Sequence, residues 1–236
     1  MERDVVPASA LAVYAHPDDP EISAGGTLAT WATGGASVWV LITARGEKGT
    51  RDPDADVDAV AERRARETAA AAARLGFAGH FSLGYDDGEV PDDTVLRGRI
   101  VRYVRELAPE VVLCPDPTAV LFGDGYFNHR DHRVTGWATL DAAASASGNP
   151  HYYPEHLREG LRVHRPRAVY LSGTLEPNTW VDISDAIEQK IDAVFCHTSQ
   201  LGDADESFRD YLRERAAEAG RSVGTGYAEA FRRLNL

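Results

Sequence analysis

Short β-rich runs alternate with longer helical segments along the first half of this chain. Four such runs lie at residues 11–15, 37–43, 80–83 and 110–114, and further strand-like runs lie at 168–171 and 180–183. Strands that alternate with helices form parallel sheets, because each crossover helix returns the chain to the same edge. We therefore expect an α/β protein with a Rossmann-like three-layer α/β/α sandwich and a mostly parallel sheet.

The size of the chain predicts one domain over residues 1–236. With 236 residues, 43% of them hydrophobic, it can bury one substantial core. Lys and Arg total 25 against 37 Asp and Glu, a net charge of −12, which disfavours nucleic acid as a partner.

Nothing in the sequence indicates a membrane protein or a secreted one. The longest apolar run, residues 38–42, is too short to span a bilayer, and residues 1–6 do not resemble a signal peptide. Cys114 and Cys196 are too few and too far apart for a disulfide framework. We expect a cytoplasmic protein with buried thiols and no membrane partner.

A histidine and two adjacent aspartates follow the first strand. The stretch AHPDDPEISAGGT contains His16, Asp18 and Asp19. Groups just past the carboxyl ends of parallel strands face the crevice where ligands bind. A structural alternative is that the aspartates cap the next helix and the histidine sits in a turn. This stretch alone leaves both readings open.

A second polar cluster follows the fourth strand. In NHRDHRVTG, Asn128 is a plausible N-cap, so His129 and His132 share one face of the first helical turn. The first and fourth strands of a doubly wound sheet can flank the same crevice, which would bring the clusters together. Histidine and aspartate donors with one open position suit a catalytic zinc and leave one aspartate as a base.

Five other histidines lack ligand spacing with an acidic companion. We expect them to be ordinary surface or hydrogen-bonded histidines, with the role of the last one left open: His80, His151, His156, His164 and His197.

With both clusters in place, the chain resembles the LmbE-like, or PIG-L, family of zinc-dependent N-deacetylases over nearly its whole length. The resemblance rests on His16-Pro-Asp-Asp19 and His129-Arg-Asp-His132. Arg45-Gly-Glu47 and the segments 83–88 and 227–231 support it.

The resemblance implies a role for each residue of the two clusters. It implies that His16, Asp19 and His132 bind one Zn2+ per chain. Asp18 would be the general base, and His129, oriented by Asp131, would assist the tetrahedral intermediate. By the same resemblance, Arg51 and Asp86 would contact a sugar-type substrate.

Two positions depart from the pattern of some relatives. Pro20 stands where some carry glutamate, although a variant with the acid one place later matches Glu21. Phe127 stands where some carry a functional tyrosine, with Tyr126 beside it. A tyrosine-assisted step is therefore in question.

The expected function is a metal-dependent N-deacetylase. It would remove acetyl from a small N-acetylglucosamine-type or related N-acyl-amino-sugar conjugate, leaving acetate and an amine. One alternative is an amidase that cleaves a larger acyl or thiol-conjugate amide at the same zinc. Another is a non-hydrolytic Rossmann-like nucleotide or sugar-binding protein, although no G-x-G-x-x-G follows the first strand. The family resemblance also allows a homo-oligomer.

Overall fold

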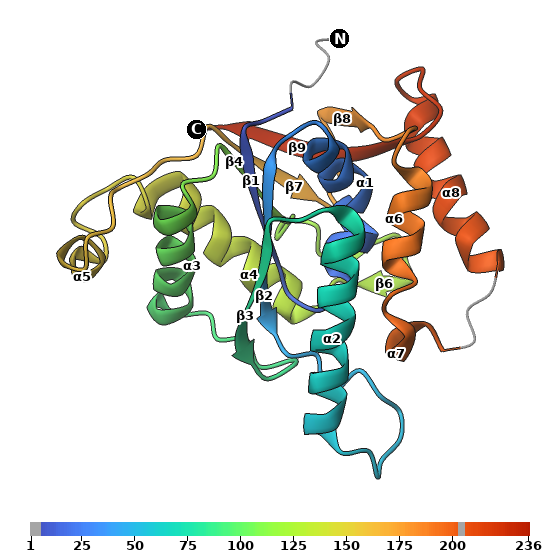
Figure 1. The fold of residues 1–236 in the computed structure, drawn as a ribbon, viewed down its shortest axis with the longest axis horizontal. Helices are drawn as coiled ribbons and strands as arrows, with labels where there is room; N and C mark the ends of the chain where they lie inside the picture. Colours follow the sequence, from blue (N-terminus) through green and yellow to red (C-terminus); the bar gives the residue numbers. More distant parts are fainter. Residues whose placement is uncertain (1–5, 203–205) are drawn as a thin grey trace.

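A seven-stranded sheet lies between two layers of helices in the computed structural model, which describes residues 6–202 and 206–236 (Figure 1). The strand order is β3-β2-β1-β4-β7-β9-β8. Strand β9 runs in the opposite direction to the other six strands of this sheet. The expected three-layer fold with a mostly parallel sheet is confirmed. Its strands are β1 (Ser9–Tyr14), β2 (Ser37–Ala44), β3 (Gly79–Tyr85), β4 (Val111–Pro115), β7 (Ala168–Ser172), β8 (Thr179–Asp182) and β9 (Ala228–Asn235).

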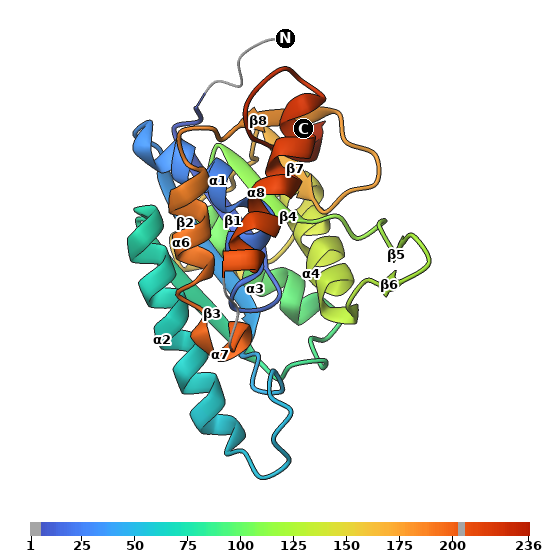
Figure 2. The ribbon, with the colours of Figure 1, turned by 90° about the vertical axis from the view of Figure 1, so that its right-hand side faces the viewer.

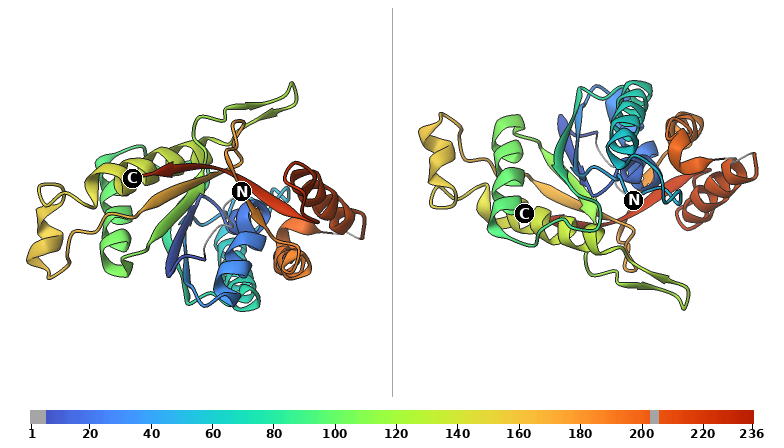
Figure 3. Two further views of the ribbon diagram at one scale, coloured as in Figure 1. Left: turned by 90° about the horizontal axis from the view of Figure 1, so that it is seen from above. Right: turned by 90° about the horizontal axis from the view of Figure 1, so that it is seen from below.

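Helices cover both faces of this sheet (Figure 3). α1, α2 and α6 lie on one face, and α3 and α4 lie on the other. The helices are α1 (Asp19–Thr33), α2 (Val57–Leu75), α3 (Thr94–Leu107), α4 (Arg130–Asp141) with its π-helical continuation η1 (Ala142–Ala146), α5 (Pro154–Arg158), α6 (Ile187–Val194), α7 (Thr198–Leu201) and α8 (Glu206–Arg221).

The central strand β1 shows why both faces are covered. Its alternate side chains enter different cores: Ala12 and Tyr14 pack with Leu28 of α1, whereas Leu11 and Val13 pack in the core of the opposite layer. All of these residues are fully buried. A strand buried on both faces reads as a continuous apolar run, as this one does.

Local sequence signals set several helix ends. Asp56 caps α2 by accepting hydrogen bonds from two backbone amides, and Gly76 ends it with a left-handed φ of 73°. Helix α6 has no such side-chain cap: it begins at Ile187, and Ser184, which as a serine could cap a helix, hydrogen-bonds to Asp182.

The elements that were not expected from the sequence include the antiparallel strand β9 and the short helices α5 and α7. They also include a hairpin of β5 (Leu121–Phe122) and β6 (Tyr126–Phe127) that projects from the body of the molecule (Figure 2). The hairpin belongs to the segment that follows β4.

The site depends on the pairing of β1 with β4. These strands are parallel neighbours, with Ala10, Leu11 and Ala12 of β1 in register with the first residues of β4. The strand order reverses direction here, so the segments that follow both strands meet at one edge, as expected.

None of the described helices is long and apolar enough to cross a bilayer. Residues 1–5, where no leader is expected, lie outside the described part.

A buried arginine fastens the irregular segment that follows η1. Arg105 of α3 is 4% exposed, and its guanidinium donates hydrogen bonds to five backbone carbonyls between residues 146 and 153. These carbonyls lie on a segment with little regular structure, so the arginine supplies the partners that a strand or helix would otherwise provide.

Arg105→Met is expected to lower the free energy of unfolding by at least about 3 kcal/mol, because buried carbonyls left without a donor cost about 1–3 kcal/mol each. Arg102→Met on the same helix is the control. It removes an exposed ion pair with Glu159, and such pairs contribute little to stability. Urea denaturation of both variants measures the difference, and equal losses would contradict the role given to Arg105.

Candidate metal centre

Three side chains from two elements and one loop bring their donor atoms together. His16 follows β1, Asp19 opens α1 and His132 lies in the first turn of α4. His16 Nδ1 is 3.2 Å from His132 Nε2 and 3.4 Å from Asp19 Oδ2, and His132 Nε2 is 3.2 Å from Asp19 Oδ1. Tetrahedral zinc with bonds of about 2.0–2.1 Å holds neighbouring donors roughly 3.3 Å apart. The three predicted ligands thus fit one zinc ion.

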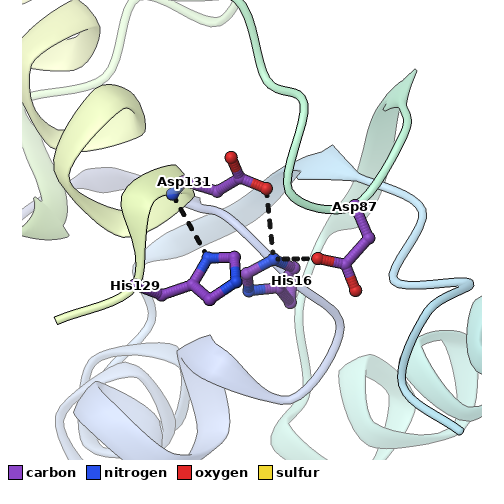
Figure 4. Close-up of side chains that lie close together, drawn as sticks. All are labelled: His16, Asp87, His129 and Asp131. Atoms are coloured by element: carbon purple, nitrogen blue, oxygen red, sulfur yellow. Dashed lines mark hydrogen bonds and ion pairs between the residues drawn. The ribbon is translucent and has the colours of Figure 1, made fainter. Parts of the chain in front are cut away.

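The outer nitrogen of each imidazole meets an acceptor. His132 Nδ1 lies 3.0 Å from Asn128 Oδ1, and the Asn128 amide is fixed by its hydrogen bond to the Ala119 carbonyl. His16 Nε2 lies 3.1 Å from Asp87 Oδ1 (Figure 4). A proton on each outer nitrogen leaves the inner nitrogen with a free lone pair, the arrangement that metal-binding histidines use.

Charge around His16 also favours a cation. Burial alone lowers the pKa of His16, but the nearby carboxylates of Asp131, Asp19 and Asp87 raise it to about 12. Burial alone raises the pKa of Asp19, but contacts with His132 and His16 hold it well below its usual value. The carboxylates therefore stabilise positive charge at this position, whether a proton or a metal ion supplies it.

His129 and Asp131 lie on the outer side of His16 (Figure 4). The His129 ring packs edge-on to the His16 ring, and its Nδ1 accepts a hydrogen bond of 3.2 Å from the Asp131 backbone amide. His129 is thus the N-cap of α4, and the expected cap at Asn128 is wrong. The Asp131 carboxylate contacts His16 Nε2 at 3.5 Å and accepts from Gly88 N.

This arrangement determines which ring nitrogen of a neutral His129 carries the proton. Because Nδ1 is an acceptor, the proton lies on Nε2, which is free to donate. Burial and the neighbouring His16 lower the pKa of His129, which favours that neutral form. The hydrogen bond to His129 comes from the backbone amide of Asp131. A role of the Asp131 carboxylate in orienting His129 therefore stays a prediction.

Asp18 is the N-cap residue of α1, but its carboxylate makes no capping hydrogen bond. Its backbone has a left-handed φ of 101°, which is rare for a non-glycine residue. Burial and the Asp19 carboxylate raise the pKa of Asp18 to about 7, and a bound cation would lower it again. A carboxylate in this range can accept a proton and return it.

The predicted substrate residues lie outside this cluster. Arg51 is exposed on the segment between β2 and α2, and Asp86 is exposed and paired with Arg45 at 2.8 Å. The residue that reaches the cluster is the neighbouring Asp87, which the sequence analysis did not select. The signal was present in the pair Asp86-Asp87, but either carboxylate could have turned inward.

Two open questions from the sequence concern His197 and Tyr126. His197 is fully buried, with Nε2 3.3 Å from Glu21 Oε2. Tyr126 lines a cavity of about 730 Å3 that also borders Asp19 and His132. Phe127 instead packs against the Arg133 guanidinium. Of the two residues in question, Tyr126 and not Phe127 lines this cavity.

Asp87→Asn is expected to weaken zinc affinity by about 10- to 100-fold, because acceptors behind a ligating histidine orient it and raise its basicity. Asp86→Asn, one residue away and paired with the partly exposed Arg45 outside the cluster, should leave zinc affinity unchanged. Competition with a chelating dye measures both constants. Equal constants for the two variants would exclude Asp87 as the residue that supports His16.

Comparison with known proteins agrees with this geometry. The family model for PIG-L, GlcNAc-PI de-N-acetylase, matches residues 11–143. A diacetylchitobiose deacetylase from Thermococcus kodakarensis is 36% identical over 223 residues, covering 94% of this chain and 81% of that protein.

Two solved structures show the range of chemistry on this fold. The N,N'-diacetylchitobiose deacetylase from Pyrococcus horikoshii, complexed with its inhibitor MPG, has a TM-score of 0.88 and 31% identity, covering 97% of this chain and 84% of that one. The 4-carboxy-2-hydroxymuconate hydratase GalB from Pseudomonas putida KT2440 has a TM-score of 0.78 and 25% identity, covering 97% and 96%. From the family model and the 36% identical relative, we conclude that this chain belongs to the PIG-L family.

Proposed function

We propose that this protein is a zinc-dependent N-deacetylase that releases acetate from an N-acetylglucosamine-type sugar. The observation that carries the proposal is the triangle of donor atoms from His16, Asp19 and His132, with Asp18 and His129 next to it. Relatives over nearly the whole chain are named as diacetylchitobiose deacetylases. One zinc per chain would be held by the three ligands.

Zinc bound at this triangle would polarise the amide carbonyl and lower the pKa of a bound water toward neutrality. Asp18 would take the proton from the attacking water. His129 would donate its Nε2 proton in a hydrogen bond to the carbonyl oxygen as negative charge develops there. Asp18 would then return the proton to the nitrogen, so that the C–N bond breaks and acetate and the amine leave.

The cavity of about 730 Å3 extends from the metal donors toward α8. Its walls include Phe122 and Tyr126 of the hairpin and Tyr211 and Arg215 of α8, but neither Asp18 nor His129. Aromatic side chains provide flat apolar faces suited to sugar rings. We propose that a distal part of the substrate occupies this space.

The same cavity supports a second candidate. It is larger than an acetyl group needs, so an amidase that cleaves a longer acyl or thiol-conjugate amide would use the same metal and base. The hydratase GalB shows a further chemistry among proteins of this fold. The length of the acyl group that is released distinguishes the deacetylase from the amidase. Release of an amine distinguishes both of them from a hydratase.

Zinc-loaded protein is expected to release acetate and a primary amine from N,N'-diacetylchitobiose in equal amounts. Removing the metal with a chelator should abolish both products, and adding zinc back should restore them. Acetate is measured by an enzyme-coupled assay and the amine with fluorescamine. Faster release from N-butanoyl or N-octanoyl glucosamine than from any acetylated sugar would favour the amidase instead.

Asp18→Asn and Asp19→Asn should have different consequences. Losing a general base typically costs about 100- to 10,000-fold in rate, so Asp18→Asn should lose turnover and keep zinc. Asp19→Asn should lose zinc affinity, because an amide oxygen is a poorer zinc donor than a carboxylate. Metal analysis and kcat on the best substrate measure both. Zinc loss in Asp18→Asn with retention in Asp19→Asn would reverse the two roles.

A further inference from the structure

Arg64, in the interior of α2, reaches across to the segment that carries Asp18. It is 3% exposed. Nη1 donates a hydrogen bond of 2.9 Å to the Gly46 carbonyl, and Nη2 donates to the Pro17 carbonyl. The same Nη2 lies 3.3 Å from Asp18 Oδ2. One guanidinium thus joins the end of β2 to the residues that precede α1.

Two glycines leave the space that this guanidinium occupies. Gly46 has a left-handed φ of 70°, and a Cβ there would overlap the Arg64 guanidinium. A Cβ at Gly49 would lie 2.7 Å from Arg64 Nη1. The segment after β2 is therefore shaped to receive a planar group at this place.

The hydrogen bond to Pro17 acts directly on the backbone of Asp18. The Pro17 carbonyl belongs to the peptide group whose rotation defines φ of Asp18. That φ is 101°, a conformation that non-glycine residues rarely adopt because it is sterically unfavourable for them. On the other side of Asp18, the Ile22 backbone amide donates a hydrogen bond of 3.0 Å to the Asp18 carbonyl. Arg64 and the first turn of α1 together hold Asp18 in place.

The contact with the side chain adds a second constraint. Nη2 engages one of the two carboxylate oxygens, and the ion pair is largely buried, with side chains 4% and 17% exposed. A buried charge pair is strong only if its geometry is good and its remaining protons are bonded. The Gly46 and Pro17 carbonyls provide such bonds for Nη1 and Nη2, whereas Nε is buried without a partner among the described residues.

We propose that Arg64 is a positioning residue for proton transfer: it holds the Asp18 backbone in its left-handed conformation and its carboxylate toward the reacting water. The role rests on the proposed function of Asp18 as the base. Lysine cannot replace it fully, because an ammonium group lacks the fork that reaches the Gly46 and Pro17 carbonyls together.

The kinetic test compares Arg64→Met, Arg64→Lys and a control, Arg63→Met. Arg63 is the preceding residue of α2, is half-exposed and hydrogen-bonds Glu67 at 3.2 Å. With N,N'-diacetylchitobiose, Arg64→Met should lower kcat on the order of 100-fold, with zinc content unchanged and KM within about threefold. Arg64→Lys should fall between wild type and Arg64→Met, and Arg63→Met should match wild type.

A double-mutant cycle separates positioning from a general loss of structure. In the Asp18→Asn background there is no base to position, so Arg64→Met should lower the remaining rate by less than about threefold. A loss as large as in wild type would show that Arg64 acts independently of Asp18 and would overturn the proposal. If Arg64→Met does not fold, the cycle is run with Arg64→Lys and read in the same way.

A crystal structure of zinc-loaded Arg64→Lys gives a readout that does not need turnover. We expect φ of Asp18 to leave the left-handed region or its carboxylate to move by about 1 Å or more. An unchanged Asp18 would overturn the positioning role. If the wild-type protein cleaves no acetamide while Asp18 moves in this variant, the proposed deacetylase function fails, and what stands is that Arg64 holds Asp18 in its conformation.

Discussion

The site depends on the opposite environments of the two nitrogens of His16. Nδ1 faces the donor atoms of Asp19 and His132, and Nε2 faces the carboxylates of Asp87 and Asp131. The carboxylates behind the ring favour one tautomer and increase its basicity, and the donors in front form the proposed metal site. The carboxylates that make the cluster negative are therefore also the groups that would give the proposed site its affinity for a cation.

The fold supplies this arrangement by joining segments that are distant in sequence. β1 and β4 are adjacent, so the segments after them meet, and the end of β3 brings Asp87 behind His16. Helix α1, which begins with Asp19, is held from its middle by Glu229 of β9. That carboxylate accepts hydrogen bonds of 3.0 and 2.7 Å from Gly26 N and Thr27 N and pairs with buried Lys190.

This packing explains why glycine occupies position 26. A Cβ on Gly26 would lie 2.5–2.9 Å from side-chain atoms of Ile183, so with any larger residue either α1 or Ile183 would have to shift. Displacing α1 would move Asp19 away from the two histidines. Close packing around the helix thus contributes to the geometry of the metal donors.

The sequence predicted the parts of the site that depend on strand ends and short helical spacing. His16 and His132 follow adjacent parallel strands, a relation that the alternation of strands and helices makes expected. Asp87 could not be separated from Asp86, because which carboxylate turns inward depends on the path of the chain after β3. Arg64 stands among similar arginines of α2, and only the packed structure shows which one is buried.

The unexpected strand β9 illustrates a second limit. Its sequence, AEAFRRLN, contains charged residues that are unusual in a strand. Glu229 is nevertheless buried, because its charge is met by Lys190 and by backbone amides of α1. Because these partners lie far away in the sequence, the local residue pattern of 228–235 did not predict a buried strand.

We propose that the metal ion binds on the Nδ1 side of His16. An anomalous difference map at the zinc absorption edge, from crystals of the zinc-loaded protein, tests it directly. We predict one peak per chain, about 2.0–2.2 Å from His16 Nδ1, an Asp19 oxygen and His132 Nε2. A peak on the Nε2 side, bound by Asp87, His129 and Asp131, would contradict it.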